Sequence, residues 1–308
     1  KTAGAVYNGG VTGHLTRLVE YVRQDNGTWT AVETGYTAPT YYPYSSYDVN
    51  PVTGRGAFFI ESRSAGEGDP NVSDRLYVYD DGGSWQHEVI EVDASSGTYD
   101  ALRFSSTGVP FLLWNNSANG NKWRGGIATP GNTNFVDVET GVYQYYACNL
   151  AVDGRGNAHI VYHVTNDKMR YRRWTGSGWT SSGSADYVVE NIEQGWYGGD
   201  AIVGLCVGPD GERKAVLYRT LTDNHVYLAT WDPTTQTWNR ELFSSGTGLT
   251  GLNLAYDCRG NLYGMYRDAN DVFHILYNDD VGRNLVTDAS FESPLPVGIT
   301  RTNSTYFF

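Results

Sequence analysis

The chain has 308 residues, with 37 Gly, 24 Tyr and 9 Trp but only 18% charged residues, a composition that favours many short strands and tight turns over helices. Its 22 Lys and Arg face 34 Asp and Glu, for a formal net charge of -12. An acidic surface repels phosphate backbones, so no nucleic-acid partner is expected. No apolar run is long enough for a membrane-spanning helix, so no membrane insertion is expected either.

Two elements recur in chain order. The first is a strand, a polar turn containing Gly, and an apolar strand that usually ends in an aromatic residue; its copies are Val52–Ser62, Phe104–Trp114, Val152–Tyr162, Gly208–Tyr218 and Tyr256–Tyr266. The second is a strand, a turn and then Trp, as in LVEYVRQDNGTW, LYVYDDGGSW, MRYRRWTGSGW and VYLATWDPTTQTW.

The ends of the second strands are spaced by about 52 residues, which is typical of a β-propeller blade. The sequence therefore predicts an all-β propeller of six four-stranded blades, formed by residues 1–308 as one domain, with seven blades as the alternative. The aromatic residues of the second and third strands are then expected mostly in the core between blades; they are Tyr79, Tyr162, Tyr171, Tyr218, Tyr227 and Tyr266. The opening KTAGAVYNGG aligns with a second strand, so the chain looks like a processed product and its first blade lacks a strand. Residues 285–308 could close the ring by pairing with the N-terminal segment, or could begin a truncated jelly-roll-like domain.

The turns before Trp carry a family resemblance. DDGGSW (residues 80–85) and DNGTW (residues 25–29) are similar to the Asp-box (BNR) repeat of sialidase-like propellers, although they lack its first Ser and differ in spacing. LAVDGRGNAHIVY resembles repeats of secreted bacterial propellers. The resemblance implies the fold and an extracellular or cell-surface location, and it does not imply an activity. A sialidase proper is not expected, because no FRIP-like motif precedes the first blade.

The loops between blades, and those between second and third strands, are expected to share one face, which we call the top. These loops are rich in aromatic residues, which stack on sugar rings while polar groups bind the hydroxyls. The alternative, given equal weight, is that the rings brace the loops or plug the funnel. The predicted glycan contacts are Tyr42, Tyr44, Tyr47, Tyr99, Arg103, Tyr143, Tyr145, Tyr146, Trp196 and Tyr197.

Acidic residues and histidines supply the catalytic candidates. Asp48, Asp100 and Asp200 are expected at the channel mouth, where they could hold calcium or act as a general acid and a base or nucleophile. The favoured reading is that they accept hydrogen bonds from neighbouring backbone N–H groups. His163 and His225, from adjacent blades, would suit β-elimination from a uronic acid if joined by Tyr and Arg.

The three cysteines, Cys148, Cys206 and Cys258, are expected to be small buried residues, with a Cys148–Cys206 disulfide left open. Taken together, the sequence predicts an extracellular carbohydrate-binding or adhesive propeller with an aromatic, acidic funnel and a polysaccharide or glycan as partner. A polysaccharide lyase or glycoside hydrolase that uses the same funnel is the first alternative, and a structural surface or virion protein is the second. No cofactor is firmly predicted, and calcium near Asp48 and Asp100 is left open.

Overall fold

A computed structural model describes most of the strands and turns of the chain. The described residues are 3–9, 15–39, 45–62, 72–95, 100–116, 122–129, 132–140, 148–164, 168–180, 187–189, 203–220, 223, 225–245, 250–256, 260–267 and 273–278.

The described strands form six antiparallel sheets of consecutive strands. Sheets two to five have four strands each, and the first and last have three. The first three sheets, here blades 1 to 3, comprise β1 (Ala3–Gly9), β2 (Leu15–Arg23) and β3 (Trp29–Pro39); β4 (Ser45–Val49), β5 (Gly56–Ser62), β6 (Val72–Asp80) and β7 (Trp85–Ser95); and β8 (Asp100–Phe104), β9 (Pro110–Asn116), β10 (Lys122–Thr129) and β11 (Asn132–Thr140).

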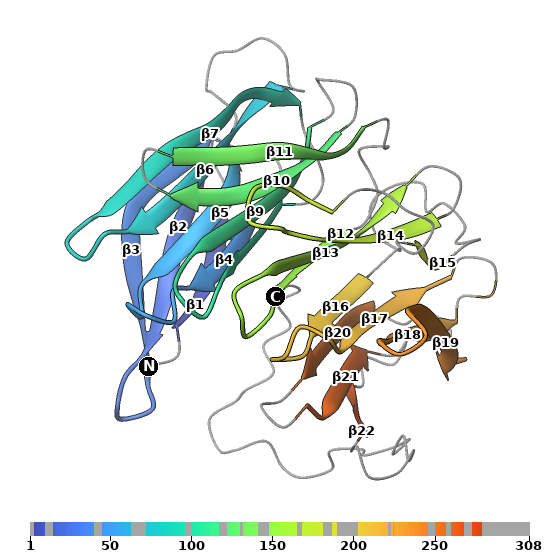
Figure 1. The fold of residues 1–308 in the computed structure, drawn as a ribbon. Coiled ribbons are helices and arrows are strands. Elements are labelled where there is room, and N and C mark those ends of the chain that lie inside the picture. The colour runs from blue at the N-terminus through green and yellow to red at the C-terminus, as the bar shows by residue number, and fades with distance from the viewer. Residues whose placement is uncertain are drawn as a thin grey trace.

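Blades 4 to 6 repeat the same order. They comprise β12 (Cys148–Val152), β13 (Ala158–Val164), β14 (Lys168–Arg173) and β15 (Tyr187–Val189); β16 (Val203–Val207), β17 (Lys214–Arg219), β18 (Val226–Asp232) and β19 (Thr237–Ser244); and β20 (Thr250–Tyr256), β21 (Leu262–Arg267) and β22 (Phe273–Asn278). The inner strands β4, β8, β12, β16 and β20 lie side by side in that order. Figure 1 shows the blades following one another from blue to red. The prediction of six blades is confirmed.

The hydrophobic core consists of layers between successive blades, which we call seams and number by the two blades that meet. Side chains alternate along each strand, so the second strand of a blade contributes to the seams on both of its faces. In β9, Leu112 and Trp114 pack in seam 2/3, whereas Phe111 and Leu113 pack in seam 3/4. This two-sided burial explains why β9 is buried at every position. Tyr162 and Tyr218, predicted as core between blades, are confirmed as buried residues of seams 3/4 and 4/5.

The turns between first and second strands interlock from blade to blade on one face, which we call the bottom. Ser106 Oγ of blade 3 donates to the carbonyl of Gly154 in blade 4, and Arg213 Nη1 of blade 5 donates to the carbonyl of Gly260 in blade 6. Gly156 and Gly260 have φ of 85° and 87°, in the left-handed region that favours glycine. The recurring Gly of the sequence repeat is therefore required by the turn.

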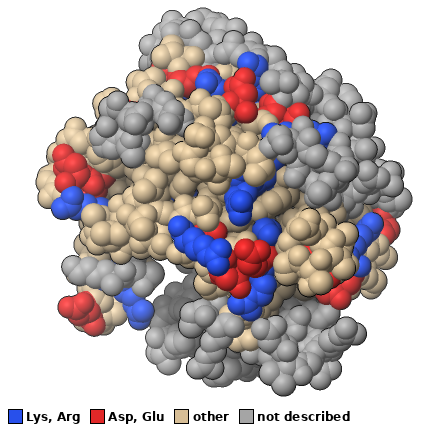
Figure 2. Space-filling view, viewed as in Figure 1, with Lys and Arg blue, Asp and Glu red and all other residues tan. Residues whose placement is uncertain are grey.

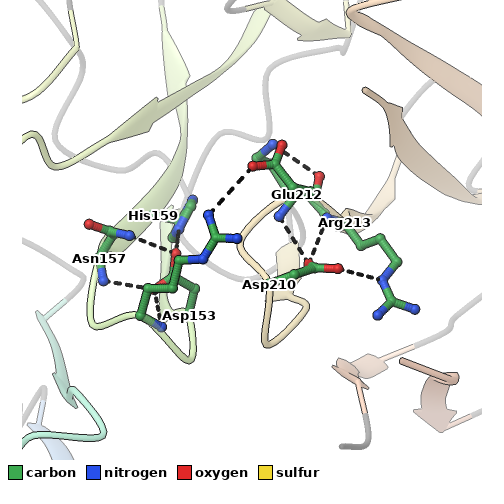
Figure 3. Close-up of polar contacts among 8 residues, drawn as sticks. Asp153, Asn157, His159, Asp210, Glu212 and Arg213 are labelled. Carbon is green, nitrogen blue, oxygen red and sulfur yellow. Dashed lines mark hydrogen bonds and ion pairs between the residues drawn. The ribbon is translucent and has the colours of Figure 1, made fainter. Parts of the chain in front are cut away.

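In blade 5, the turn between the first and second strands also contains a carboxylate that accepts hydrogen bonds, and this turn lies against the corresponding turn of blade 4. Figure 3 shows Asp153 with Asn157 in one turn and His159 beside them in β13, and it shows Asp210 with Arg213 in the next turn. Arg155 Nη1 lies 3.8 Å from Glu212 Oε1 and links the two turns.

Three expectations about the ends and the cysteines can now be placed. β1 takes the second-strand position of blade 1, as the alignment predicts, since among the described strands it pairs with the third strand β2 and with no other. Residues 285–308 and Cys258 lie outside the described residues. Cys206 on β16 is a free buried thiol, so the disulfide to Cys148 left open by the sequence is absent.

The surface carries charges of both signs. In the face seen in Figure 2, acidic and basic side chains lie in small mixed groups. No helix among the described residues is long and apolar enough to cross a membrane.

Candidate functional site at the blade seams

Most of the predicted aromatic contacts fall in loops between the described strands. Only Tyr47 and Arg103 have described side chains; the others, Tyr42, Tyr44, Tyr99, Tyr143, Tyr145, Tyr146, Trp196 and Tyr197, lie outside the described residues, as does Asp200. Their role in binding stays a prediction.

Tyr47 fills seam 1/2. Its hydroxyl donates to Glu20 Oε1 at 2.6 Å, and its ring lies 4.8 Å from that of Phe58. Burial, together with the hydrogen bond to Glu20, raises the pKa of Tyr47. The side chain of Arg103 is exposed and donates to the carbonyl of Leu102. Tyr47 therefore braces two blades in the described structure.

Asp48 fixes neighbouring inner strands together. Its Oδ2 accepts the backbone N–H of Phe104 at 2.8 Å and its Oδ1 accepts that of Val49 at 2.9 Å. Ser46 Oγ accepts the N–H of Leu102 at 3.0 Å. These bonds fix the register of β4 against β8. They also confirm the favoured reading of Asp48 as an acceptor of backbone hydrogen bonds.

The same register corrects the expectation that Asp48 and Asp100 occupy equivalent places at one channel mouth. Asp48 is level with Phe104, four positions from Asp100, and a strand rises by about 3.3 Å per residue. The two backbone positions are thus roughly 13 Å apart along the channel, so the two residues lie at different levels of it. No group of three metal-ligating side chains surrounds Asp48 within the described part of the chain, and the side chain of Asp100 is outside it.

The two candidate histidines differ in exposure. His163 lies in β13, opposite Met169, and its side chain is buried. It lies one residue before the end of β13 and thus beside a top loop, and it belongs to the strand face that carries Val161 and packs in seam 4/5. His225 lies just before β18, and its Nδ1 is 3.3 Å from Asp223 Oδ2. Both histidines therefore belong to the region where blades 4 and 5 meet.

Seam 2/3 has a polar cluster above its apolar layer. Glu91, from the outer strand β7, accepts hydrogen bonds from Trp114 Nε1 of β9 and from Arg124 Nη1 of β10. Asp137 of β11 lies 3.2 Å from Arg124 Nε, and the guanidinium lies 5.7 Å from the Trp114 ring. Glu91 is nearly buried at 8% exposure, whereas Arg124 is 29% exposed. A nearly buried carboxylate and a partly exposed guanidinium are thus held against a fully buried indole.

Seam 3/4 repeats this chemistry one blade further on. Glu139 Oε2, from the outer strand β11, accepts from Tyr162 Oη at 3.1 Å, Arg170 Nη1 at 2.6 Å and Arg172 Nη2 at 2.9 Å. Arg172 Nε also donates to Tyr162 Oη, and Arg172 Nη1 donates to the carbonyl of Thr180. Burial raises the pKa of Tyr162, so its hydroxyl stays protonated. The carboxylate is therefore fixed by three donors.

The two clusters share one plan. In each, the outer strand of one blade supplies Glu, the second strand of the next blade supplies the aromatic residue, and its third strand supplies Arg. Trp114 and Tyr162 are aligned in the sequence repeat, and Arg124 and Arg170 sit opposite them in the sheet register. A carboxylate and a partly exposed guanidinium side by side can bind neighbouring sugar hydroxyls. The aromatic rings of Trp114 and Tyr162 are fully buried and support these polar groups from within the seam. We call these groups the seam clusters.

No sequence motif marks the seam clusters. Glu91 and Arg124 are 33 residues apart, and so are Glu139 and Arg172. No local motif joins them. The one available signal was that each outer strand carries a Glu before a repeat whose second strand ends in an aromatic residue. Tyr162 was correctly predicted as core, but its hydroxyl was not expected to take part in a polar group.

Comparison with known proteins identifies the fold. No family model matches the chain, so the Asp-box resemblance has no support from that comparison, and no curated protein matches. Solved structures do match. A mutant of the Aleuria aurantia lectin in complex with Fucα1-6GlcNAc has a TM-score of 0.55 at 13% identity, covering 96% of this chain and 94% of the lectin.

Two further matches agree with it. The six-bladed β-propeller structure of the same fungal lectin, described with a novel fucose recognition mode, has a TM-score of 0.53 at 12% identity, covering 97% of each chain. The BP39L lectin of Burkholderia pseudomallei has a TM-score of 0.52 at 11% identity, covering 91% of this chain and 82% of the lectin. The chain is therefore similar along nearly its whole length to lectins of this architecture, and its fold is a six-bladed β-propeller.

Proposed function

We propose that this chain is a secreted glycan-binding propeller whose binding sites lie at the seams between blades, with an α-L-fucoside as the first ligand to test. The observation that carries the proposal is the recurrence of the Glu–aromatic–Arg cluster at two successive seams, with a partly exposed guanidinium in each. Similarity of fold to fucose-binding lectins supports the choice of ligand.

The geometry supports binding better than catalysis. Among the described residues, Asp48 is engaged with backbone N–H groups and is far along the channel from Asp100. His163 is buried inside a strand. A seam cluster instead offers donors and an acceptor that are already fixed by one another, which suits repeated recognition of hydroxyl groups.

The test is isothermal titration calorimetry of the intact chain with methyl α-L-fucoside, backed by retention on a polyvalent α-L-fucosyl matrix. We expect saturable binding at more than one site, with affinity about tenfold or more weaker at seam 2/3 in Arg124→Ala and at seam 3/4 in Arg170→Ala, because each variant loses a charge-assisted hydrogen bond at its own seam. Arg155→Ala is the matched control, since Arg155 is 63% exposed on the bottom face.

The same preparations are screened with neutral and acidic polysaccharides, with and without Ca²⁺, by absorbance at about 235 nm and by reducing ends. Turnover with either readout would favour the enzyme alternative. Absence of saturable binding to any fucoside or polysaccharide, or binding that both arginine variants retain in full, would overturn the seam proposal.

A further inference from the structure

The hairpin turn between β2 and β3 carries the pattern Asn-x-Ser/Thr, which is the acceptor sequence for asparagine-linked glycosylation. The pattern is formed by Asn26, Gly27 and Thr28, and residues 24–28 are all exposed. The N–H of Gln24 donates to the carbonyl of Thr28, and Gly27 has a φ of 83°, as in a tight hairpin turn that ends in a left-handed residue. Because the strands of a blade are antiparallel, this turn lies at the bottom end, opposite the loops beside the seam clusters.

Two hydrogen bonds orient the side-chain amide of Asn26. Its Oδ1 accepts the backbone N–H of Thr28 at 3.0 Å and the Thr28 hydroxyl at 2.7 Å. A backbone N–H can only donate, so the atom that it meets is the carbonyl oxygen of the amide, and Nδ2 lies on the other side. A sugar on Nδ2 would leave both hydrogen bonds in place, because a glycosylated amide keeps its carbonyl oxygen. The turn can therefore keep its conformation when Asn26 is modified.

The other acceptor sequences of the chain differ in where they lie. They begin at Asn71, Asn115 and Asn303. Asn71 and Asn303 lie outside the described residues. Asn115, near the top end of β9, is 0% exposed. Since a glycan is bulky and hydrophilic, a chain modified at Asn115 could not pack β9 between its neighbours. Of the two acceptor asparagines in the described part of the chain, Asn26 is thus the one with space for a sugar.

A half-exposed tryptophan directly follows the acceptor sequence. Trp29 is 50% exposed, whereas Trp85, at the same place in the next blade, lies with its ring 5.6 Å from that of Phe58 and packs in seam 1/2. An indole has a large apolar face, which can stack on the C–H face of a sugar. The Trp29 ring therefore offers apolar surface that a glycan on Asn26 can cover.

We infer that Asn26 is the acceptor of an asparagine-linked glycan carried on the bottom face. In the reaction, Asn26 Nδ2 forms a bond to C1 of the first sugar and loses one proton. The bond from C1 to the diphosphate of a lipid-linked oligosaccharide donor breaks, and the diphosphate leaves with the electron pair. The inference rests on the secretion that the proposed function includes, and it does not depend on the seam clusters. Because those clusters lie at the opposite end of the strands, the glycan would leave them open.

The test is expression of the intact chain through the secretory pathway of a eukaryotic host whose asparagine-linked glycans contain no fucose. The protein's own glycan then does not compete with methyl α-L-fucoside. Protein from the medium and from the cells is treated with peptide-N-glycosidase in water labelled with heavy oxygen, which converts each occupied Asn into a labelled Asp. Peptide mass spectrometry reads each acceptor separately. We expect most copies of Asn26 to be occupied, and Asn115 to be unoccupied in the folded protein.

Two variants of Thr28 locate the effect. Thr28→Val removes the hydroxyl that the acceptor sequence requires and keeps Asn26, so the glycan on Asn26 should be lost. Thr28→Ser keeps the hydroxyl and should retain the glycan. Both variants should keep the parent's thermal midpoint to within a few degrees, because the turn is exposed.

Three results would overturn this inference: an unmodified Asn26 in the parent chain, equal occupancy in Thr28→Val, or a glycan on Asn115 in folded protein. Titration of the same preparations with methyl α-L-fucoside tests the proposed function separately. Fucoside binding by a chain that carries no glycan on Asn26 overturns this inference alone. A glycan on Asn26 in a chain that binds no fucoside or polysaccharide confirms this inference and overturns the proposed function.

Discussion

The buried turn carboxylate of blade 4 gives the sharpest test of how this propeller is held together. Asp153 is 4% exposed. It accepts the backbone N–H of Arg155 at 2.9 Å and of Asn157 at 2.8 Å, the Asn157 amide at 2.9 Å, and His159 Nε2 at 3.2 Å. His159 Nδ1 in turn lies 2.6 Å from Tyr171 Oη. The Asp153 carboxylate thus accepts the hydrogen bonds of the turn and positions the buried imidazole of His159.

Asp153→Ala leaves these donors without an acceptor. Each buried donor that loses its partner costs about 1–3 kcal/mol, and water can reach the partly exposed Arg155 and Asn157. We expect a total loss of about 3–5 kcal/mol in the free energy of unfolding, a large share of the stability of a typical domain. The measurement is urea unfolding followed by tryptophan fluorescence at neutral pH.

The pH dependence supplies a second readout of the same variant. Burial acts to raise the pKa of Asp153, but the hydrogen bonds from His159 and Asn157 outweigh it and hold that pKa well below its usual range. A carboxyl with a depressed folded-state pKa stabilises the fold above its unfolded pKa of about 3.9, and this contribution is lost as the pH falls toward the folded value. The stability gap between the parent chain and Asp153→Ala should therefore narrow as the pH is lowered below about 4.

The matched control is Asp210→Ala, at the corresponding turn of blade 5. Asp210 also accepts two backbone N–H groups, at 3.0 and 3.3 Å, but its side chain is 39% exposed and water can replace it. Its loss should be clearly smaller. If both variants lose the same stability, or if Asp153→Ala loses less than about 1 kcal/mol, burial of the turn is not what makes Asp153 important.

Three further outcomes follow from the seams and turns. Leu112→Ala in seam 2/3, where the side chain is fully buried, should lower the free energy of unfolding by about 2–5 kcal/mol in the same urea assay, because it leaves a cavity between two blades. Gly211→Ala should lower the thermal midpoint, since Gly211 has φ of 74° and a Cβ there would meet the Asp153 carboxylate. Burial raises the pKa of the Cys206 thiol, so iodoacetamide should label Cys206 only in denaturant, as read by peptide mass spectrometry.

The sequence repeat predicted the architecture well because it follows from local rules. A polar turn with Gly between two strands, and a turn before Trp, are each specified by neighbouring residues. Counting these units gave the blade number, and alternation along the second strands indicated the buried tyrosines. Asp48 was correctly read as an acceptor of backbone hydrogen bonds; one of its donors is its neighbour Val49, and the other, Phe104, belongs to the next blade.

The functional chemistry was harder to predict because it is not local. Asp48 and Asp100 look equivalent in the sequence, yet the register of β4 against β8 places them at different levels of the channel. Glu139 and Arg172 meet only because two blades stack, and no spacing rule within one blade relates them. The predicted loop aromatics were chosen for residue type alone, which does not specify where a long loop places its side chains.

The same seam contacts could stabilise the propeller, bind sugar, or do both, and one pair of measurements separates these roles. Glu139 is 20% exposed and Arg172 is 9% exposed, so their pairing is partly screened by solvent. A double-mutant cycle with Glu139→Gln and Arg172→Met should give a coupling of about 1–3 kcal/mol in the free energy of unfolding.

For the same variants, fucoside affinity gives the second readout. If Glu139 and Arg172 only stabilise the fold, the variants should be less stable but, once shown to be folded, should bind sugar with unchanged affinity. If the pair both stabilises the fold and binds sugar, the variants should lose stability and sugar affinity. The affinity should be lost at seam 3/4 only, and the binding that depends on Arg124 in seam 2/3 should remain. A coupling near zero together with unchanged affinity would remove both roles from Glu139 and would leave the polar group of seam 3/4 without an energetic explanation.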